Sequence, residues 1–165
     1  MIRSLGWILL VMLTMQNAFA EPAITATTSA PPSRRHALYV EILGKSGTWG
    51  LGYSYQVHRR FAVGAVGSYT VLSDQRMLSF SPSVTAYPLG ADSHRLFVDA
   101  GPQFVRLTTP SPVPEWMGKT ENGIGAQLSV GYEYRGPVFA RLFVMGVAGK
   151  SGVAPWLGMD LGWAF

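Results

Sequence analysis

The feature that most constrains this 165-residue chain is a two-residue alternation of side-chain type that continues to its last residue. Near the end, Met159, Leu161, Trp163 and Phe165 are large and apolar, whereas the residues between them are small or acidic. Successive side chains of a β-strand point to opposite faces of a sheet, so this period predicts strands and not helices.

Seven further segments of this kind precede the last one and are separated by turn-forming residues. The eight segments span roughly residues 37–43, 49–57, 61–70, 78–87, 96–104, 124–134, 138–145 and 158–165. Segments of about ten residues have the length that a tilted strand needs to cross a bilayer. We therefore predict an all-β fold, a single eight-stranded antiparallel up-and-down transmembrane β-barrel over residues 36–165.

The composition of the two strand faces separates a membrane barrel from its alternative, a soluble barrel or sandwich. Charged residues make up 13% of the chain, about half of the roughly 25% that is typical of globular domains. The less apolar face carries mostly Gly, Ser and Ala with isolated acidic residues, and lacks the many Lys and Glu of a solvated face. Small residues suit a crowded barrel interior, so the apolar face is predicted to meet lipid.

The first 35 residues are predicted to be a targeting segment and a linker. Residues 1–20 combine Arg3, a short apolar stretch and an Ala-Phe-Ala ending, which is the pattern of a cleaved signal peptide. Residues 21–35 are rich in Pro, Ala, Ser and Thr and predict a disordered periplasmic linker. No uninterrupted apolar run long enough for a spanning helix follows them, which leaves a closed barrel as the predicted way of crossing the membrane.

Aromatic residues near the segment ends predict where the barrel meets the membrane interface. One level, the predicted periplasmic girdle, contains Tyr55, Phe61, Tyr132, Tyr134, Trp163 and Phe165. Trp49 and Tyr69 fall at the opposite level. An even number of strands places both termini on one side, which we predict to be the periplasmic side.

Four connections are then predicted to be extracellular, at residues 44–47, 72–76, 108–123 and 149–152. Only the third is long enough to bind a partner, and loops of this size often carry function. Its candidate contact residues for an unknown surface ligand are Glu115, Trp116 and Met117.

Two prolines fall on the predicted lipid face within strands. Pro82 and Pro102 each lack the N–H that a strand donates to its neighbour. We therefore expect bulges or local breaks of the sheet at these positions.

The hairpin meander, the aromatic girdles and the C-terminal strand resemble the small eight-stranded outer-membrane barrels of Gram-negative bacteria, the opacity-type and OmpA/OmpX-like group. The resemblance covers about residues 37–165 and implies an outer-membrane location, with membrane lipid and lipopolysaccharide as partners. Members of this group carry a terminal strand that the barrel assembly machinery recognises. By resemblance, Leu161, Trp163 and Phe165 would carry this signal here. Because the fold hosts adhesins, enzymes and anchors, it does not identify a function.

The sequence predicts no catalytic, cofactor or metal site. A lipid acyl hydrolase needs a Ser–His pair that faces the outer leaflet, whereas His36, His58 and His94 all fall at the predicted periplasmic end. The acidic residues form no metal-binding cluster, and a chain without Cys has no thiolate ligands. The formal charge of +4 comes from scattered basic residues and not from a patch, which argues against nucleic-acid binding.

The predicted interior nevertheless carries charge, because Glu41, Asp99, Glu133 and Asp160 share a face with Arg141. Buried charges must pair, so we expect Arg141 to lie centrally and to bond one of these carboxylates, with Asp99 and Asp160 as the leading candidates.

Bulky apolar residues are also predicted to point inward and to block water. They are Phe97, Phe139, Phe143, Met145 and Trp156. The favoured function is therefore a non-catalytic structural or surface-interaction barrel with a plugged lumen. The alternatives are a lipid-modifying enzyme, namely an acyl hydrolase, and a narrow pore.

Overall fold

The computed structural model describes residues 34–72, 75–91, 93–110, 118–149 and 152–165. Its eight strands in these residues are β1 (His36–Gly44), β2 (Gly47–His58), β3 (Phe61–Leu72), β4 (Gln75–Ala91), β5 (His94–Thr109), β6 (Lys119–Arg135), β7 (Val138–Gly149) and β8 (Gly152–Ala164). The predicted signal peptide and most of the predicted linker lie outside the described residues. Among the described residues, no helix is long and apolar enough to span a membrane.

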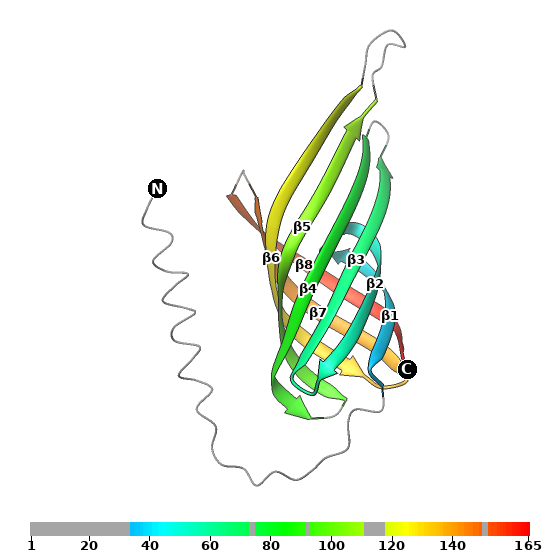
Figure 1. Ribbon diagram of the computed structural model, residues 1–165, viewed down its shortest axis with the longest axis vertical. Coiled ribbons are helices and arrows are strands. Elements are labelled where there is room, and N and C mark those ends of the chain that lie inside the picture. The colour runs from blue at the N-terminus through cyan, green and yellow to red at the C-terminus, as the bar shows by residue number, and fades with distance from the viewer. Residues whose placement is uncertain (1–33, 73–74, 92, 111–117, 150–151) are drawn as a thin grey trace, which may run out of the picture. The chain divides into compact units, whose positions relative to one another are not determined.

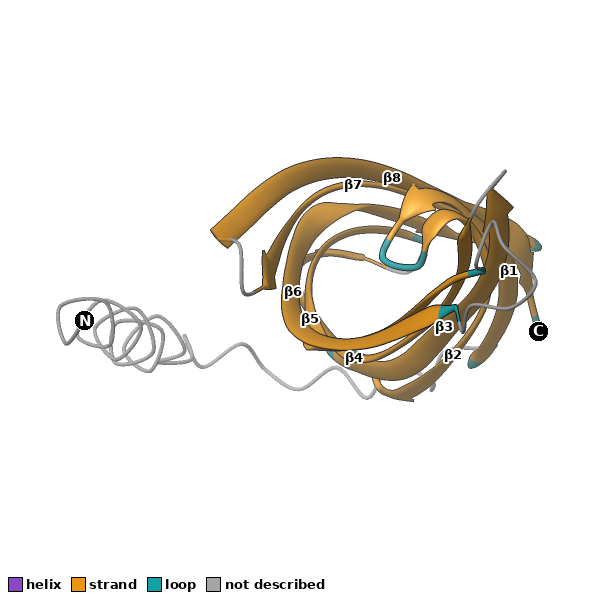
Figure 2. Cartoon of the chain, turned by 90° about the horizontal axis from the view of Figure 1, so that it is seen from above, coloured by secondary structure: helices purple, strands orange, loops and turns teal. Residues whose placement is uncertain are grey.

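The strands form a closed antiparallel barrel in which each strand pairs with the next along the chain and β8 pairs with β1 (Figure 1). Figure 2 shows the ring of strands from above. Beyond the last pair of β1 and β8, the backbone N–H of His36 donates to the Phe165 carbonyl at 2.8 Å, and the Phe165 N–H donates back at 2.9 Å. The predicted all-β, eight-stranded antiparallel barrel is confirmed.

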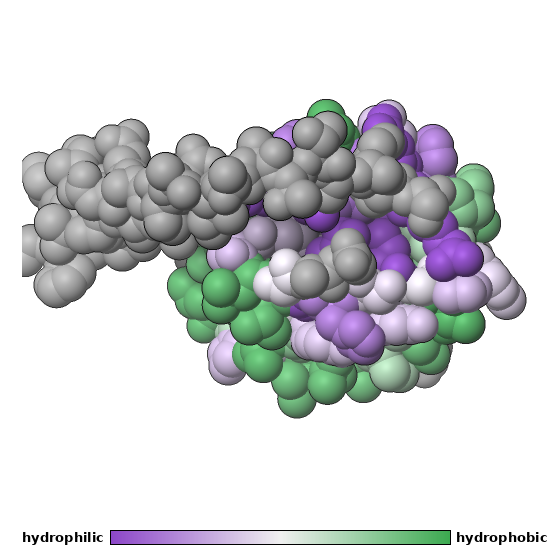
Figure 3. Space-filling view, turned by 90° about the horizontal axis from the view of Figure 1, so that it is seen from below, coloured by the Kyte–Doolittle hydropathy of each residue, from purple (hydrophilic) through white to green (hydrophobic). Residues whose placement is uncertain are grey.

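The two faces of the sheet differ in the way that the alternation predicts. On β1, Tyr39 and Glu41 are buried, whereas Leu38, Val40 and Ile42 are each more than a third exposed. Seen from below, hydrophobic residues lie around the rim of the barrel and hydrophilic residues gather at its centre (Figure 3). An apolar exterior around a polar interior is the reverse of a soluble barrel and is typical of transmembrane barrels.

β3 to β6 continue beyond their neighbours at the end of the barrel where β3 turns into β4 and β5 into β6 (Figure 1). We call this part the four-strand extension; it comprises residues 68–72, 75–79, 105–109 and 119–125. The predicted extracellular loops at 72–76 and 108–123 were therefore too long, because β4 already begins at Gln75 and β5 pairs with β6 as far as Thr109 and Lys119.

The β4–β5 ladder is interrupted where Pro82 lies opposite Pro102 and resumes in the same register on the other side. Neither proline has an N–H to donate, which accounts for the interruption. The expected local break therefore occurs without a bulge. The register of this pair shifts instead between Ala86 and Leu89, a segment that contains Pro88.

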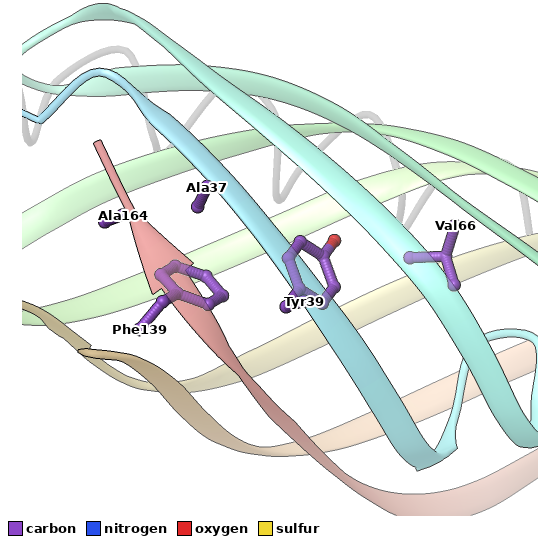
Figure 4. Packing of buried hydrophobic residues seen from close by; sticks show 5 residues of the cluster. All are labelled: Ala37, Tyr39, Val66, Phe139 and Ala164. Carbon is purple, nitrogen blue, oxygen red and sulfur yellow. The ribbon is translucent and has the colours of Figure 1, made fainter. Parts of the chain in front are cut away.

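Aromatic side chains fill the interior where the opposing strand offers space. Tyr39 of β1 and Phe139 of β7 pack with ring centroids 5.1 Å apart, and Val66 of β3 belongs to the same buried cluster (Figure 4). Gly52 lies opposite Tyr39 on β2, and a Cβ at this position would come within 2.3 Å of the tyrosine ring. The small residues of the inward face thus make room for the large ones.

We expect Gly52→Ala to lower the free energy of unfolding by about 1–3 kcal/mol, because the added methyl group overlaps the packed Tyr39 ring. Gly67→Ala is the matched control, since its Cβ would meet only the Ser79 carbonyl oxygen, at 3.8 Å. Urea unfolding of both variants in lipid vesicles, followed by tryptophan fluorescence, measures the difference. Equal stabilities of the two variants would contradict this description of the interior.

Candidate functional site

The barrel interior contains a network of buried charges. Eight charged residues of the described part of the chain are at most 8% exposed: Glu41, Asp99, Glu133, Asp160, Lys45, Arg95, Arg135 and Arg141. Four are acidic and four are basic, so their formal charges balance. Buried charges are tolerated when they are paired and hydrogen-bonded, and Glu133 and Asp99 meet this condition through contacts between several strands. Both carboxylate oxygens of Asp160 lack a hydrogen-bond partner within the described residues.

Glu133 of β6 is the most extensively bonded carboxylate of the network. One of its oxygens accepts hydrogen bonds from Arg141 Nε at 2.6 Å and from the Tyr87 hydroxyl at 2.9 Å. The other oxygen accepts from Arg135 Nε at 2.8 Å. Arg135 also reaches β2, where it donates to the Ser54 hydroxyl at 3.1 Å. This cluster links β2, β4, β6 and β7 across the interior.

Arg141 is buried in the interior, but its main partner differs from the two that the sequence favoured. It stands directly opposite Glu133 of β6 and directly opposite Asp160 of β8. Its nearest contact with Asp160 is 3.9 Å, whereas Glu133 lies at 2.6 Å. Arg141 thus bonds one of the four predicted carboxylates, while Asp99, one of the two leading candidates, pairs with Lys45 instead. Alternation assigns these residues to one face but does not assign the register that decides the partner.

Aromatic rings surround the Arg141 guanidinium. Its central carbon lies 4.8 Å from the ring centroid of Phe97 and 5.0 Å from that of Phe139. Cation–π contacts of this kind stabilise a cation that has left water. Phe97, Phe139, Phe143 and Met145 are all buried, whereas Trp156, which was also predicted to block water, is 47% exposed.

The turn between β1 and β2 lies inside the barrel. Lys45 and Ser46 form this turn, and each is only 1% exposed. Lys45 Nζ lies 2.9 Å from Asp99 Oδ1 of β5. The second oxygen of Asp99 accepts hydrogen bonds from the hydroxyls of Ser83 and Thr85, each at 2.9 Å. Asp99 is thus held by Lys45 at one carboxylate oxygen and by two hydroxyl groups of β4 at the other.

Ser46 attaches the same turn to three strands. Its backbone N–H and its hydroxyl each donate to Glu41 of β1 at 2.9 Å. Its carbonyl accepts from the hydroxyls of Ser68 on β3 and Ser79 on β4, at 2.6 and 2.8 Å. In addition, Gln103 of β5 donates to the Lys45 carbonyl. The turn is therefore bonded to β1, β3, β4 and β5.

A local change of backbone direction brings the turn inward. Leu43 has a φ of 50°, a left-handed conformation that a leucine adopts rarely. Ile42 and Leu43 are both exposed and the next three residues are buried, so the alternation of β1 stops here. Gly158 of β8 permits the bend, because a Cβ there would lie 2.8 Å from the Leu43 carbonyl oxygen.

Sequence reasoning placed a connection at residues 44–47 but missed its burial, since an extracellular loop was expected there. A signal was available: the predicted interior contained four carboxylates and one arginine, so three cations were unaccounted for. The structure supplies Lys45, Arg95 and Arg135. These residues lie at or next to turns, where alternation does not assign a face.

The three histidines contact residues of the predicted periplasmic girdle. His36 packs against Phe165 and Tyr55, His58 against Phe61, and His94 against Tyr132 and Tyr134. Trp163 is also at this end and is 72% exposed. The ring nitrogens bond Tyr53, the Arg60 N–H and Tyr132 within the described residues, so they form no Ser–His pair there.

Other parts of the described structure offer little chemistry. No group of three or more His, Asp and Glu among its residues is arranged to hold a metal ion. A cavity of about 610 Å³ lies beside residues 121–125 of β6. Its lining includes Gln103, Glu121, Asn122, Ile124 and Val147. The predicted ligand-contact residues Glu115, Trp116 and Met117 lie outside the described residues.

Solved structures that are similar to this barrel include the following three. No protein-family model and no curated protein sequence matches the chain. The N-terminal β-barrel domain of OprF from Pseudomonas aeruginosa aligns with a TM-score of 0.62 and 15% identity, over 79% of this chain and 95% of that one. The similarity shows a shared architecture at a level of sequence identity too low to transfer an activity.

Two further barrels align over the same share of this chain. Ail, the attachment invasion locus protein of Yersinia pestis, was solved with the heparin analogue sucrose octasulfate and aligns with a TM-score of 0.52 and 9% identity, over 79% of this chain and 95% of that one. Neisserial surface protein A aligns with a TM-score of 0.50 and 14% identity, over 79% and 93%. The chain has the fold of the small eight-stranded outer-membrane barrels. The expectation drawn from the hairpin meander is thus confirmed for the fold.

We expect Glu133→Gln to lower the free energy of unfolding by about 3–5 kcal/mol, because it removes the buried counter-charge of Arg135 and the closest counter-charge of Arg141. The control is Lys119→Gln at an ion pair with Glu121 that is largely exposed, where no measurable change is expected. Urea titration in detergent micelles measures both variants. Equal effects of the two substitutions would show that the interior network contributes no more than a surface pair.

Proposed function

We propose that this chain is a non-catalytic outer-membrane barrel with a structural or surface-interaction role, whose lumen is plugged by its own β1–β2 turn. The single observation that carries the proposal is the position of Lys45 and Ser46. Both are buried in the interior and are bonded to strands on several sides of it. A turn held in this way obstructs a path that would otherwise run along the barrel axis.

The exterior of the barrel supports the membrane location. Large apolar side chains around the barrel are 37–74% exposed, and only lipid or another protein would cover such a surface favourably. The three similar structures have the same architecture. In the proposed orientation both termini are periplasmic, and lipid and lipopolysaccharide surround the strands.

The alternatives have less support. An acyl hydrolase would place a histidine beside a serine near the outer leaflet, whereas the histidines lie at the end of the barrel that carries Phe165, against aromatic rings. A pore would need a continuous polar path, whereas Phe97, Phe139 and Phe143 are buried in the interior together with the turn. These contacts favour a barrel that neither cleaves lipid nor conducts ions.

Cysteine accessibility tests both the plug and the orientation, since the chain has no Cys of its own. In intact cells, we expect a membrane-impermeant thiol reagent to label Thr48→Cys, because Thr48 is exposed beside the turn. Ser46→Cys should react at least about tenfold more slowly, since the side chain is buried. Arg60→Cys, in the β2–β3 turn at the opposite end, should be labelled only after the outer membrane is permeabilised.

The plug, the orientation and the membrane location can each be contradicted separately. Equal labelling rates for Ser46→Cys and Thr48→Cys would refute a packed turn, as would stable unitary conductance of the wild-type protein in planar bilayers. Labelling of Arg60→Cys but not Thr48→Cys in intact cells would show that the barrel is inserted in the orientation opposite to the proposed one. Failure of the protein to show heat-modifiable gel migration would argue against a membrane barrel altogether.

Deletion of Phe165 tests the proposed interaction with the barrel assembly machinery. We expect a reduced amount of barrel in the outer membrane, because Leu161, Trp163 and Phe165 are the proposed assembly signal. The deletion also removes two closing hydrogen bonds to His36, so stability must be measured separately. The matched control is Phe165→Tyr, which keeps an aromatic ring and should assemble to the same level as the wild type. An unchanged amount of barrel in the outer membrane after the deletion would contradict this part of the proposal.

A further inference from the structure

Two arginines lie on the outward face of the four-strand extension. Arg76 of β4 and Arg106 of β5 are both exposed and have the same parity as the outward-facing Leu78 and Phe104. Since successive side chains alternate, the two guanidinium groups extend from the side of the sheet that carries the apolar exterior of the barrel. Both arginines lie beside the apolar exterior of the barrel, at the end where β3 turns into β4 and β5 into β6.

The two arginines are close neighbours on this face. In the β4–β5 pairing, Arg106 is opposite Leu78 and Arg76 is opposite Thr108, so the arginines occupy diagonal positions. Side chains at diagonal positions of an antiparallel pair are within reach of each other when they are long. Two like charges at this spacing repel, which favours an anion between them.

The surroundings of the pair supply neutral hydrogen-bonding groups. Thr108 is opposite Arg76, and Asn122 of β6 is opposite Arg106 on its other side. None of the ion pairs within the described residues involves either arginine. By contrast, the buried Arg135 and Arg141 both bond Glu133. The outward pair is therefore available to an external anion.

The position along the barrel restricts what this anion is. An arginine that faces lipid is costly within the hydrocarbon region and is tolerated near the interface, where headgroups lie. Tyr69 of β3 is opposite Leu78 and is 49% exposed, as expected of an aromatic residue at such an interface. Headgroup phosphates present paired oxygens that match the planar fork of a guanidinium group.

We propose that Arg76 and Arg106, assisted by Thr108 and Asn122, bind a phosphate group in the headgroup of a phosphorylated glycolipid of the surrounding leaflet. In the proposed orientation this leaflet is the outer one, and the lipid has the chemistry of the lipid A part of lipopolysaccharide. The inference rests on the proposed function, since it requires a barrel inserted in a membrane. It assigns a specific anion site to the lipid-facing surface of the barrel.

The test measures how many lipid A molecules the detergent-solubilised barrel retains, by native mass spectrometry over a lipid titration. Bisphosphorylated and dephosphorylated lipid A are compared, and inorganic phosphate is tested as a competitor. The variant is Arg76→Gln with Arg106→Gln. The charge-matched control is Arg59→Gln with Arg60→Gln in the β2–β3 turn at the opposite end. Heat-modifiable migration establishes that each protein is folded.

We expect the wild type and the control to prefer the bisphosphorylated lipid. The affinity of the Arg76/Arg106 variant should fall about fivefold for each arginine removed. Inorganic phosphate at millimolar concentration should compete only weakly, since it lacks the acyl chains. Equal affinities of the variant and the control, or equal binding of dephosphorylated lipid by the wild type, would overturn the inference. A variant with that result that still shows heat-modifiable migration would leave the proposed function intact, whereas absence of heat-modifiable migration in every protein would argue against the proposed function itself.

Discussion

The carboxylate of Glu133 lies between Arg135 and Arg141 in the interior of the barrel, with one arginine bonded to each of its oxygens. A closed barrel of eight strands has little space for water, so each of these charges depends on the others for the interactions it loses on burial. The same requirement acts at Asp99, which pairs with Lys45. Pairing of buried charges across the interior thus determines which strands and which turn must come together.

The β1–β2 turn is a consequence of this requirement. To reach Asp99, Lys45 has to enter the barrel, and the left-handed backbone of Leu43 accompanies the change of direction. The bend is an unfavourable conformation on its own, and it persists because several hydrogen bonds and an ion pair hold the turn. The proposed plug therefore follows from the interior electrostatics and needs no separate domain or loop.

The exterior follows a different rule, because lipid selects for apolar side chains and tolerates charge only near the headgroups. Among the described strand residues, the side chains of Arg76 and Arg106 are the charged exception on the lipid side, and they lie on the four-strand extension. The sequence did not single them out, since Arg76 was assigned to the predicted loop 72–76 and Arg106 lies beyond the predicted strand segment 96–104. Their common face became visible only when the β4–β5 register was known. Their diagonal placement is what turns two scattered charges into one anion site.

Alternation by itself determined the strands, their two faces and the closed barrel, because a period of two assigns each side chain to the interior or the exterior wherever a strand is regular. It placed Glu133, Arg141 and Asp160 on one face without showing which of them touch. A shift of two residues in register preserves the alternation and changes every partner, so the Glu133–Arg141 contact was decided by the tertiary structure. The burial of Lys45 was decided there too, because turn residues have no alternating face and their position depends on the charges that the folded interior presents.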